Sequence, residues 1–197
     1  GVGARAMLGL AWTWLSAAGD GAIRQQAARA VDGGSMSLAR SGLAALQPWD
    51  CPERQQATTA FAKRWRQRPV ILDAWFAMEA SAPFGDGMAR ADALLQDPAF
   101  DPNAPNSLRA VLGGFGRCAE HFHRTDGRGY QWMAQQLVAV DQRNPIAASR
   151  MLKLFMGWRR YSPERQQLMR ASLEWLAENL SSPNSKEVVM LCLGTAD

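Results

Sequence analysis

The chain has 197 residues, with a hydrophobic content of 47% and a charged content of 20%, which are ordinary values for a globular protein with a substantial core. Its net charge at pH 7 is +4, yet only three of the 22 basic residues are lysines, and the arginines are scattered. A nucleic-acid site needs a coherent basic face, and a membrane helix needs about 20 consecutive apolar residues. We therefore expect neither nucleic acid nor membrane as a partner, and we interpret the densest basic cluster, residues 63–68, as a solvated helix end.

Apolar residues recur at intervals of three and four from the start of the chain, which is typical of α-helices. The pattern predicts helices over residues 7–15, 20–31 and 38–46. Asp20 is expected to cap the second of these, because an aspartate side chain accepts hydrogen bonds from the free N–H groups of a first helical turn.

Proline residues divide the next part of the chain. Pro52 opens a helix that is expected to bury Phe61 and Trp65, and Pro69 interrupts that helix. One face of the helix that follows is expected to carry the apolar residues Val70, Ile71, Ala74, Trp75 and Met78.

Two loops and two helices are predicted for the middle of the chain. Residues 81–87 read as a loop before a short helix over residues 88–95, and residues 97–105, with three prolines, read as an irregular connection. The helix that begins near Leu108 is expected to fray at Gly113-Gly114, because glycine weakens a helix interior.

The last third contains paired start signals for helices. Residues 130–140 form one predicted helix, and Asn144-Pro145 and Ser162-Pro163 each combine a capping side chain with a proline suited to the first turn. The helix over residues 162–180 is amphipathic, and it places Arg170 four residues before Glu174. The eight tryptophans of the chain are interpreted mainly as core residues.

These patterns give about ten helices joined by short loops and no alternating strand, so the sequence predicts an all-α fold. Antiparallel neighbours stacked in pairs would form a superhelical array of the armadillo or HEAT kind. No linker is long or polar enough to mark a boundary, so we expect a single helical domain over residues 1–197. The sequence does not begin with Met, and we interpret it as a fragment of a longer chain.

Few motifs in the sequence favour catalysis or metal binding. Cys118, His121 and His123 form one short cluster, but a zinc site needs about four ligands and no second group is evident. The segment 126–130 is interpreted as a turn, since it lacks the Lys-Ser/Thr of a phosphate-binding loop. There is no H-E-x-x-H and no G-x-S-x-G, while paired carboxylates remain open because spacing along a chain does not give spacing in space. Three dispersed cysteines fit a reducing cytoplasm.

Several motifs, spread in order over most of the chain, point to a known family. They are Phe61-x-x-Arg64-Trp65, Pro69-Val-x-Leu72-Asp73-x-Trp75-Phe76, Asn106-x-Leu108-Arg109, Phe115, Phe122-His123-x-x-Asp126-Gly127-x-Gly129-Tyr130, Asn144-Pro145, Ala148-Ser149-Arg150, Arg160-Tyr161 and the helix to Asn179-Leu180. In order and spacing they resemble the C-terminal helical domain of bacterial aminopeptidase N, a zinc metallopeptidase of the gluzincin type. The resemblance becomes thin after Leu180, and Ile146 stands where relatives can carry a polar side chain.

The resemblance implies a non-catalytic cap that closes over the active-site chamber of an aminopeptidase and restricts the access of peptides. It implies that Arg150, on the helix after Asn144-Pro145, faces the chamber, and that Arg109 lines it less directly. On its own the chain would then be no enzyme and would hold no cofactor, because the zinc belongs to a catalytic domain outside it. That domain would be its partner, and an uncovered contact face would favour self-association. The alternative is an independent helical-repeat scaffold that binds a protein.

Overall fold

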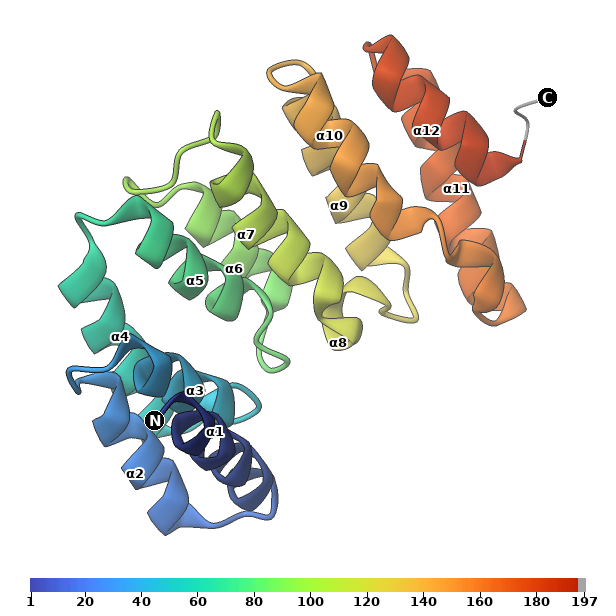
Figure 1. Ribbon diagram of the computed structural model, residues 1–197. Helices are drawn as coiled ribbons and strands as arrows, with labels where there is room; N and C mark the ends of the chain where they lie inside the picture. Colours follow the sequence, from blue (N-terminus) through green and yellow to red (C-terminus); the bar gives the residue numbers. More distant parts are fainter. Residues whose placement is uncertain (195–197) are drawn as a thin grey trace. The chain divides into compact units, whose positions relative to one another are not determined.

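The computed structural model describes residues 1–194, and over this range it consists of α-helices and two short 3-10 helices, with no β-strand (Figure 1). The expectation of an all-α fold is therefore confirmed. No helix within the described range is long and apolar enough to cross a membrane. The helices are α1 (Val2–Ala17), α2 (Gly21–Val31), α3 (Met36–Leu46), α4 (Pro52–Trp65), α5 (Pro69–Ala80), α6 (Gly87–Leu95), α7 (Pro105–Arg117), α8 (Ala119–Phe122), α9 (Arg128–Asp141), α10 (Pro145–Leu152), η1 (Lys153–Phe155), η2 (Trp158–Arg160), α11 (Pro163–Asn179) and α12 (Pro183–Leu193).

The helices group into two compact units, and the chain passes from one to the other inside α5. The first unit holds residues 1–75 and 82–84, and the second holds residues 76–81 and the described residues from Gly85 onward. The expectation of a single domain over residues 1–197 stays a prediction.

The first unit is built on α3, which packs against α1, α2 and α4. Its core is apolar, and a buried polar contact joins α1 to α3, where the Ser16 hydroxyl donates to the Ala45 carbonyl at 2.8 Å. Gly42 lets α3 approach α2 closely, because a Cβ at this position would lie 2.3 Å from the carbonyl oxygen of Ala27. The main core residues of this unit are Trp12, Ala27, Val31, Leu43, Leu46, Ala57 and Phe61.

The second unit is a stack in which α9 packs against both α10 and α11, and α12 packs against both α10 and α11 (Figure 1). This pattern of contacts is the one expected of stacked helix pairs. Its core is aromatic: the ring of Phe122 meets the rings of Tyr130 and Phe155 edge to face, with centroids 5.1 and 5.6 Å apart. Edge-to-face pairs add about 0.5–1.5 kcal/mol each beyond the area that they bury.

Most of the predicted helix starts are confirmed by their hydrogen bonds. The side chain of Asp20 accepts from the N–H groups of Ala22 and Ile23, and that of Asn144 accepts from the N–H of Ala147. Ser162 differs, because its hydroxyl makes no capping bond to α11. The proline beside it and the Arg170–Glu174 ion pair of 2.8 Å are as predicted.

One expectation about a helix interior was wrong, and in another helix the buried face differs from the face that the pattern marked. The helix α7 does not fray at Gly113-Gly114 but continues to Arg117, because Gly114 lies where a Cβ would meet the Ala77 carbonyl oxygen at 2.9 Å. In α5 the expected apolar face is not the buried one, since Val70 is exposed and the buried residues are Leu72, Phe76 and Ala80. Nearly every position of α5 is apolar, so periodicity could not select the face.

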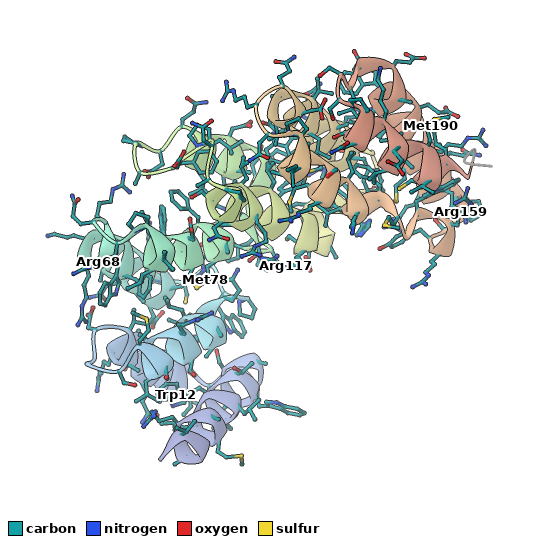
Figure 2. The ribbon with its side chains drawn as sticks, turned by 45° about the horizontal axis from the view of Figure 1, so that its top comes forward. Trp12, Arg68, Met78, Arg117, Arg159 and Met190 are labelled. Atoms are coloured by element: carbon teal, nitrogen blue, oxygen red, sulfur yellow. The ribbon has the colours of Figure 1, made fainter. Side chains whose placement is uncertain are left out.

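The segment after Leu180, where the resemblance became thin, forms α12 and is held from two sides. At its start, the buried carboxylate of Asp141 accepts hydrogen bonds from the backbone N–H groups and hydroxyls of Ser181 and Ser182. Burial works to raise the pKa of Asp141, but the hydrogen bonds from the Ser182 side chain and from this backbone outweigh it and hold the pKa well below its usual range. At its end, Arg159, labelled in Figure 2, donates to the carbonyls of Cys192 and Leu193.

Replacing Gly129 by alanine is expected to lower the free energy of unfolding by about 3 kcal/mol. A Cβ at this position would lie 2.1 and 2.6 Å from the carbonyl oxygens of His121 and Phe122, which are backbone atoms that cannot turn away. Chemical denaturation measures the effect. The control is Gly3→Ala, where a Cβ meets nothing within 4 Å, and which should be neutral or slightly stabilising because alanine favours a helix. Equal stability of the two variants would contradict the close contact.

Replacing Asp141 by asparagine is expected to cost about 2 kcal/mol of unfolding free energy, since charge-assisted hydrogen bonds to a buried group are lost. Because the folded pKa of Asp141 is lowered, the unfolded chain binds more protons, so this contribution is complete above pH of about 4 and is lost on acidification. Denaturation at pH 7 and pH 3 should show a difference between the two proteins that shrinks at low pH. The matched control, Asp20→Asn at an exposed cap, should change stability by less than about 0.5 kcal/mol.

Candidate functional site

The two arginines expected to line a chamber lie on helices that pack together, Arg109 on α7 and Arg150 in the last turn of α10. Both side chains are exposed. A guanidinium nitrogen of Arg109 donates to the Asn106 side-chain oxygen at 3.0 Å. Arg150 has no hydrogen-bond or ion-pair partner among residues 1–194, so its guanidinium is available to a ligand.

A third arginine, Arg117, belongs to the same surface and was not expected from the sequence. It lies two helical turns after Arg109, and between them a Cβ at Gly113 would contact Arg109 Cγ and Arg117 Nη1, both at 3.4 Å. The sulfur of Met151, the residue after Arg150, lies 4.0 Å from the same point. The expected break at Gly113 concealed this spacing, which on a continuous helix would have placed both arginines on one face.

We call Arg109 and Arg117 on α7, together with Arg150 on the neighbouring helix α10, the arginine surface. Arg117, labelled in Figure 2, is exposed in the last turn of α7, and it has no carboxylate partner in the described part of the chain. Guanidinium groups bind carboxylates through two parallel hydrogen bonds, which is stronger and more directional than a single contact. The arrangement is therefore suited to an anionic group, such as the carboxylate of a peptide.

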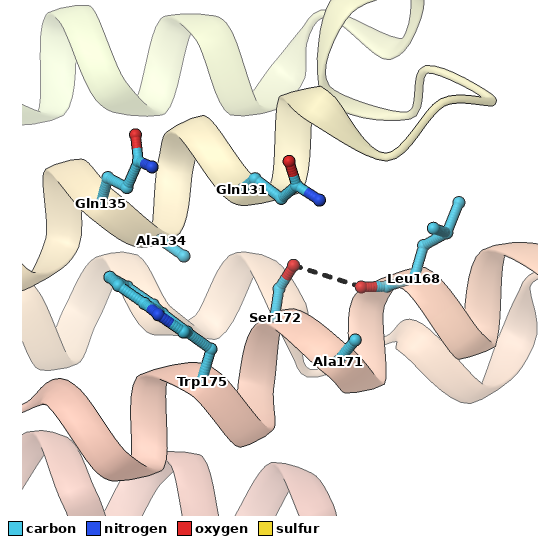
Figure 3. Close-up of a pocket in the computed structure, with 7 residues that line it drawn as sticks. All are labelled: Gln131, Ala134, Gln135, Leu168, Ala171, Ser172 and Trp175. Carbon is cyan, nitrogen blue, oxygen red and sulfur yellow. Dashed lines mark hydrogen bonds between the residues drawn. The ribbon is translucent and has the colours of Figure 1, made fainter.

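A concave feature lies between α9 and α11, and we call it the α9–α11 groove (Figure 3). Its volume is about 310 Å³. Small side chains leave this space, because Ala134 and Ser172 are buried at its floor. The lining residues are Gln131, Ala134, Gln135, Leu168, Ala171, Ser172 and Trp175.

Some polar side chains of the groove form hydrogen bonds within the protein, and others do not. The Ser172 hydroxyl donates to the Leu168 carbonyl at 3.1 Å, so it is used within α11. The amides of Gln131 and Gln135 are exposed and have no hydrogen-bond partner among residues 1–194. The Trp175 side chain is 39% exposed, although the tryptophans were expected mainly in the core. Only the four-residue spacing of the two glutamines on one helix could have indicated this site from the sequence.

The histidines near Cys118, which the sequence did not favour as metal ligands, have other partners. In His123, Nδ1 is 2.8 Å from the Tyr130 hydroxyl and Nε2 is 3.0 Å from the Tyr161 hydroxyl, so the ring joins both tyrosines of the chain. Burial, and then the positive charge of Arg165, lower the pKa of His123. A neutral imidazole has one donor and one acceptor nitrogen, which fits one hydroxyl on each side.

The other two residues of that cluster, His121 and Cys118, also make contacts within the protein. His121 is buried and stacks on Phe115, with ring centroids 6.4 Å apart. Burial raises the pKa of the Cys118 thiol to about 11, and its sulfur donates to the Glu120 carboxylate at 3.4 Å. Within residues 1–194, no three His, Cys, Asp or Glu side chains are grouped so that they could hold a metal ion.

Comparison with known proteins identifies relatives of the whole fold. A family described as "Domain of unknown function (DUF3458_C) ARM repeats" matches residues 1–194. The chain is 41% identical over 140 residues to aminopeptidase N of Caulobacter vibrioides, an alignment that covers 70% of this chain and 16% of that protein. It is 33% identical over 150 residues to aminopeptidase N of Escherichia coli, covering 75% of this chain and 17% of the relative. The chain thus spans a small part of the length of these relatives.

A solved structure has the same fold. It is the crystal structure of Legionella pneumophila aminopeptidase A in complex with aspartic acid, which superposes with a TM-score of 0.81 at 25% sequence identity. The superposition covers 88% of this chain and 21% of that one. The resemblance to the helical domain of aminopeptidase N is therefore confirmed.

The ring of His123 is expected to titrate below the ordinary histidine value of about 6.5. Between the folded and unfolded pKa values the unfolded chain binds more protons, so stability should fall as the pH drops below about 6.5 towards the folded pKa. NMR titration of the ring gives the pKa, and replacement by glutamine should flatten the pH dependence of unfolding in this window. A ring pKa at or above 6.5 would contradict this buried environment beside Arg165.

Proposed function

We propose that this chain, which belongs to the family of ARM-repeat domains designated DUF3458_C, is a non-catalytic helical part of a zinc-dependent aminopeptidase. In that enzyme it closes over the active-site chamber and restricts access to peptides from which N-terminal residues are removed. The proposal is supported by the relatives, which are aminopeptidases and of which the chain matches only 16–17%.

The chemistry of peptide hydrolysis lies outside this chain in our proposal. The sequence has no H-E-x-x-H, and the two histidines have tyrosine and aromatic partners. Zinc bound in a catalytic domain would activate the attacking water. The residues of this chain would bind and orient peptides and limit their access. Its three cysteines are free thiols, which is consistent with a cytoplasmic location.

A structural feature that fits the proposal, beside the relatives that carry it, is the outer face of α1. Val2, Met7, Leu10 and Trp14 are 76, 68, 57 and 77% exposed, and the last three are spaced as one stripe. The other face of the helix, with Trp12, is buried in the first unit. A helix that is apolar all round is normally buried, and each such side chain gains about 1.5–3 kcal/mol on burial.

The partner that covers this face, in our proposal, is another part of the same polypeptide, the catalytic domain included. The relatives are long enough to supply it, since most of their length lies outside the match. When the face is uncovered, α1 would make the isolated chain self-associate.

The arginine surface gives the cap a role towards substrate. The Arg150 and Arg117 guanidiniums have no partner within residues 1–194, and a peptide carboxylate would supply one. Arg109 on α7 would also contact this carboxylate, and its guanidinium is already oriented by the hydrogen bond to Asn106.

An independent helical-repeat scaffold is the second candidate, and the same α1 face favours it, since a separate protein could also cover it. The two candidates differ in what the chain does to a peptidase, which an experiment with a truncated relative separates.

We expect this chain to restore or alter peptide cleavage when it is added to Caulobacter vibrioides aminopeptidase N that lacks the matching region. Arg150→Ala should then raise KM about tenfold for peptides with a free C-terminal carboxylate, because a bidentate contact worth about 1.4 kcal/mol is lost. Peptides with an amidated C-terminus should be unaffected. Steady-state kinetics with both peptide series measures the difference.

The matched control is Arg143→Ala, an exposed arginine in the loop after α9, which should leave both KM values unchanged. Replacing both Met7 and Trp14 by serine should weaken the association with the truncated enzyme and the self-association of the chain. Hydrolysis of an amino-acid anilide by the chain alone, abolished by a chelator, would overturn the proposal. An absence of any effect on the truncated enzyme would favour the scaffold.

A further inference from the structure

We infer that the α9–α11 groove is a binding site for an extended, uncharged peptide segment, recognised mainly through its backbone. The inference rests on the groove alone and does not depend on the aminopeptidase proposal. It concerns a surface in the second unit that involves neither the arginine surface nor α1.

The first argument is the chemistry of the lining. None of its seven side chains is charged, so the part of a ligand that enters the groove gains no ion pair there. A charged group would lose hydration without compensation. The free polar groups are the primary amides of Gln131 and Gln135, each with donors and an acceptor. A peptide group presents the same combination, and one glutamine can pair with both the N–H and the C=O of a peptide residue.

The second argument is spacing. Gln131 and Gln135 are four residues apart on α9, which places their Cα atoms about 6 Å apart along the helix. In an extended chain, residues i and i+2 project to the same side and are about 6.6–6.8 Å apart. In an extended peptide that lies along α9, the backbone groups of residue i would therefore face one glutamine amide, and those of residue i+2 would face the other.

The third argument is the position of Trp175. In Figure 3 its indole ring extends from α11 over the floor near Ala134, and the two glutamines lie along α9 opposite α11. The exposed part of the ring offers an apolar surface to a side chain of the peptide. Small residues keep this space open, since the floor consists of Ala134 and Ser172 and no large side chain fills it.

The size of the groove limits what it binds. A volume of about 310 Å³ is near the lower end of the usual range for ligand pockets, so a short peptide segment with small or medium apolar side chains fits best. Backbone hydrogen bonds supply affinity in such recognition, and the side-chain pocket supplies selectivity. We therefore expect tolerance of sequence, with a preference against charged residues at the centre.

The test uses the intact chain and a defined peptide, acetyl-Ala-Val-Ala-Val-Ala-amide, whose termini carry no charge and whose residues all carry a backbone N–H. Titration followed by NMR should give saturable shifts of the side-chain amides of Gln131 and Gln135 and of the indole N–H of Trp175. The variants Gln131→Ala, Gln135→Ala and Trp175→Ala should each weaken binding about tenfold. These side chains are exposed, so the variants should keep the helical circular dichroism and the stability of the original chain.

Two controls make the test specific. Gln167→Ala removes an exposed glutamine from α11 outside the groove and should leave the affinity unchanged. Two further peptides are methylated on backbone nitrogens, one at its odd-numbered and one at its even-numbered residues. Only one of the two should lose binding, since only one edge of the backbone meets the glutamines. Equal binding of the original and of both methylated peptides would overturn the inference. So would shifts at the groove that grow with protein concentration without peptide, because they would identify a second copy of the chain as the occupant.

Discussion

Close contact between helix backbones is the constraint on which both units depend. In the first unit a Cβ at Gly42 would lie 2.3 Å from the Ala27 carbonyl oxygen, and in the second a Cβ at Gly129 would lie 2.1 Å from that of His121. Such positions accept only glycine, since a larger residue would separate the two elements and open the core beside them. The helices therefore pack closely because a few positions carry no side chain. In the second unit, the aromatic residues around Phe122 fill the core.

The same constraint shapes the arginine surface. Gly114 faces inward against α5, and its neighbour Gly113 lies between Arg109 and Arg117, which cover it together with Met151. A glycine pair that weakens an isolated helix is stable here because tertiary contacts favour the helical conformation. In α7, Gly114 thus allows close packing against α5, and Gly113 lies between the two arginines.

Local chemistry explains which parts of the fold could be predicted from the sequence. Caps and proline starts depend on neighbouring residues, so Asp20, Asn144 and Pro69 were interpreted correctly. The buried face of α5 depended on which neighbour packs against an almost wholly apolar helix, and a single sequence does not contain that information. The role of Asp141 was hidden for a similar reason, because its partners Ser181 and Ser182 lie about 40 residues away.

The candidate sites also divide into those that could be expected from the sequence and those that required the tertiary structure. Arg150 and Arg109 came from the resemblance to a family, and the structure places them on packed helices. Arg117 and the groove residues required the tertiary structure, since a free amide is recognised only when its possible partners are known to be absent. The eight tryptophans illustrate this, because Trp12 is core while Trp14 and Trp175 are exposed, and all three occur in apolar helical patterns.

The distribution of charge gives the second unit two different kinds of surface. The arginine surface is suited to a carboxylate, which occurs once at the C-terminus of a peptide, whereas the α9–α11 groove is suited to peptide groups, which recur along its length. A carboxylate contact is screened by salt when exposed, while backbone hydrogen bonds in a neutral groove are nearly independent of it. Ionic strength therefore separates the two surfaces experimentally, since in our proposals one surface selects a peptide by its terminus and the other by its backbone.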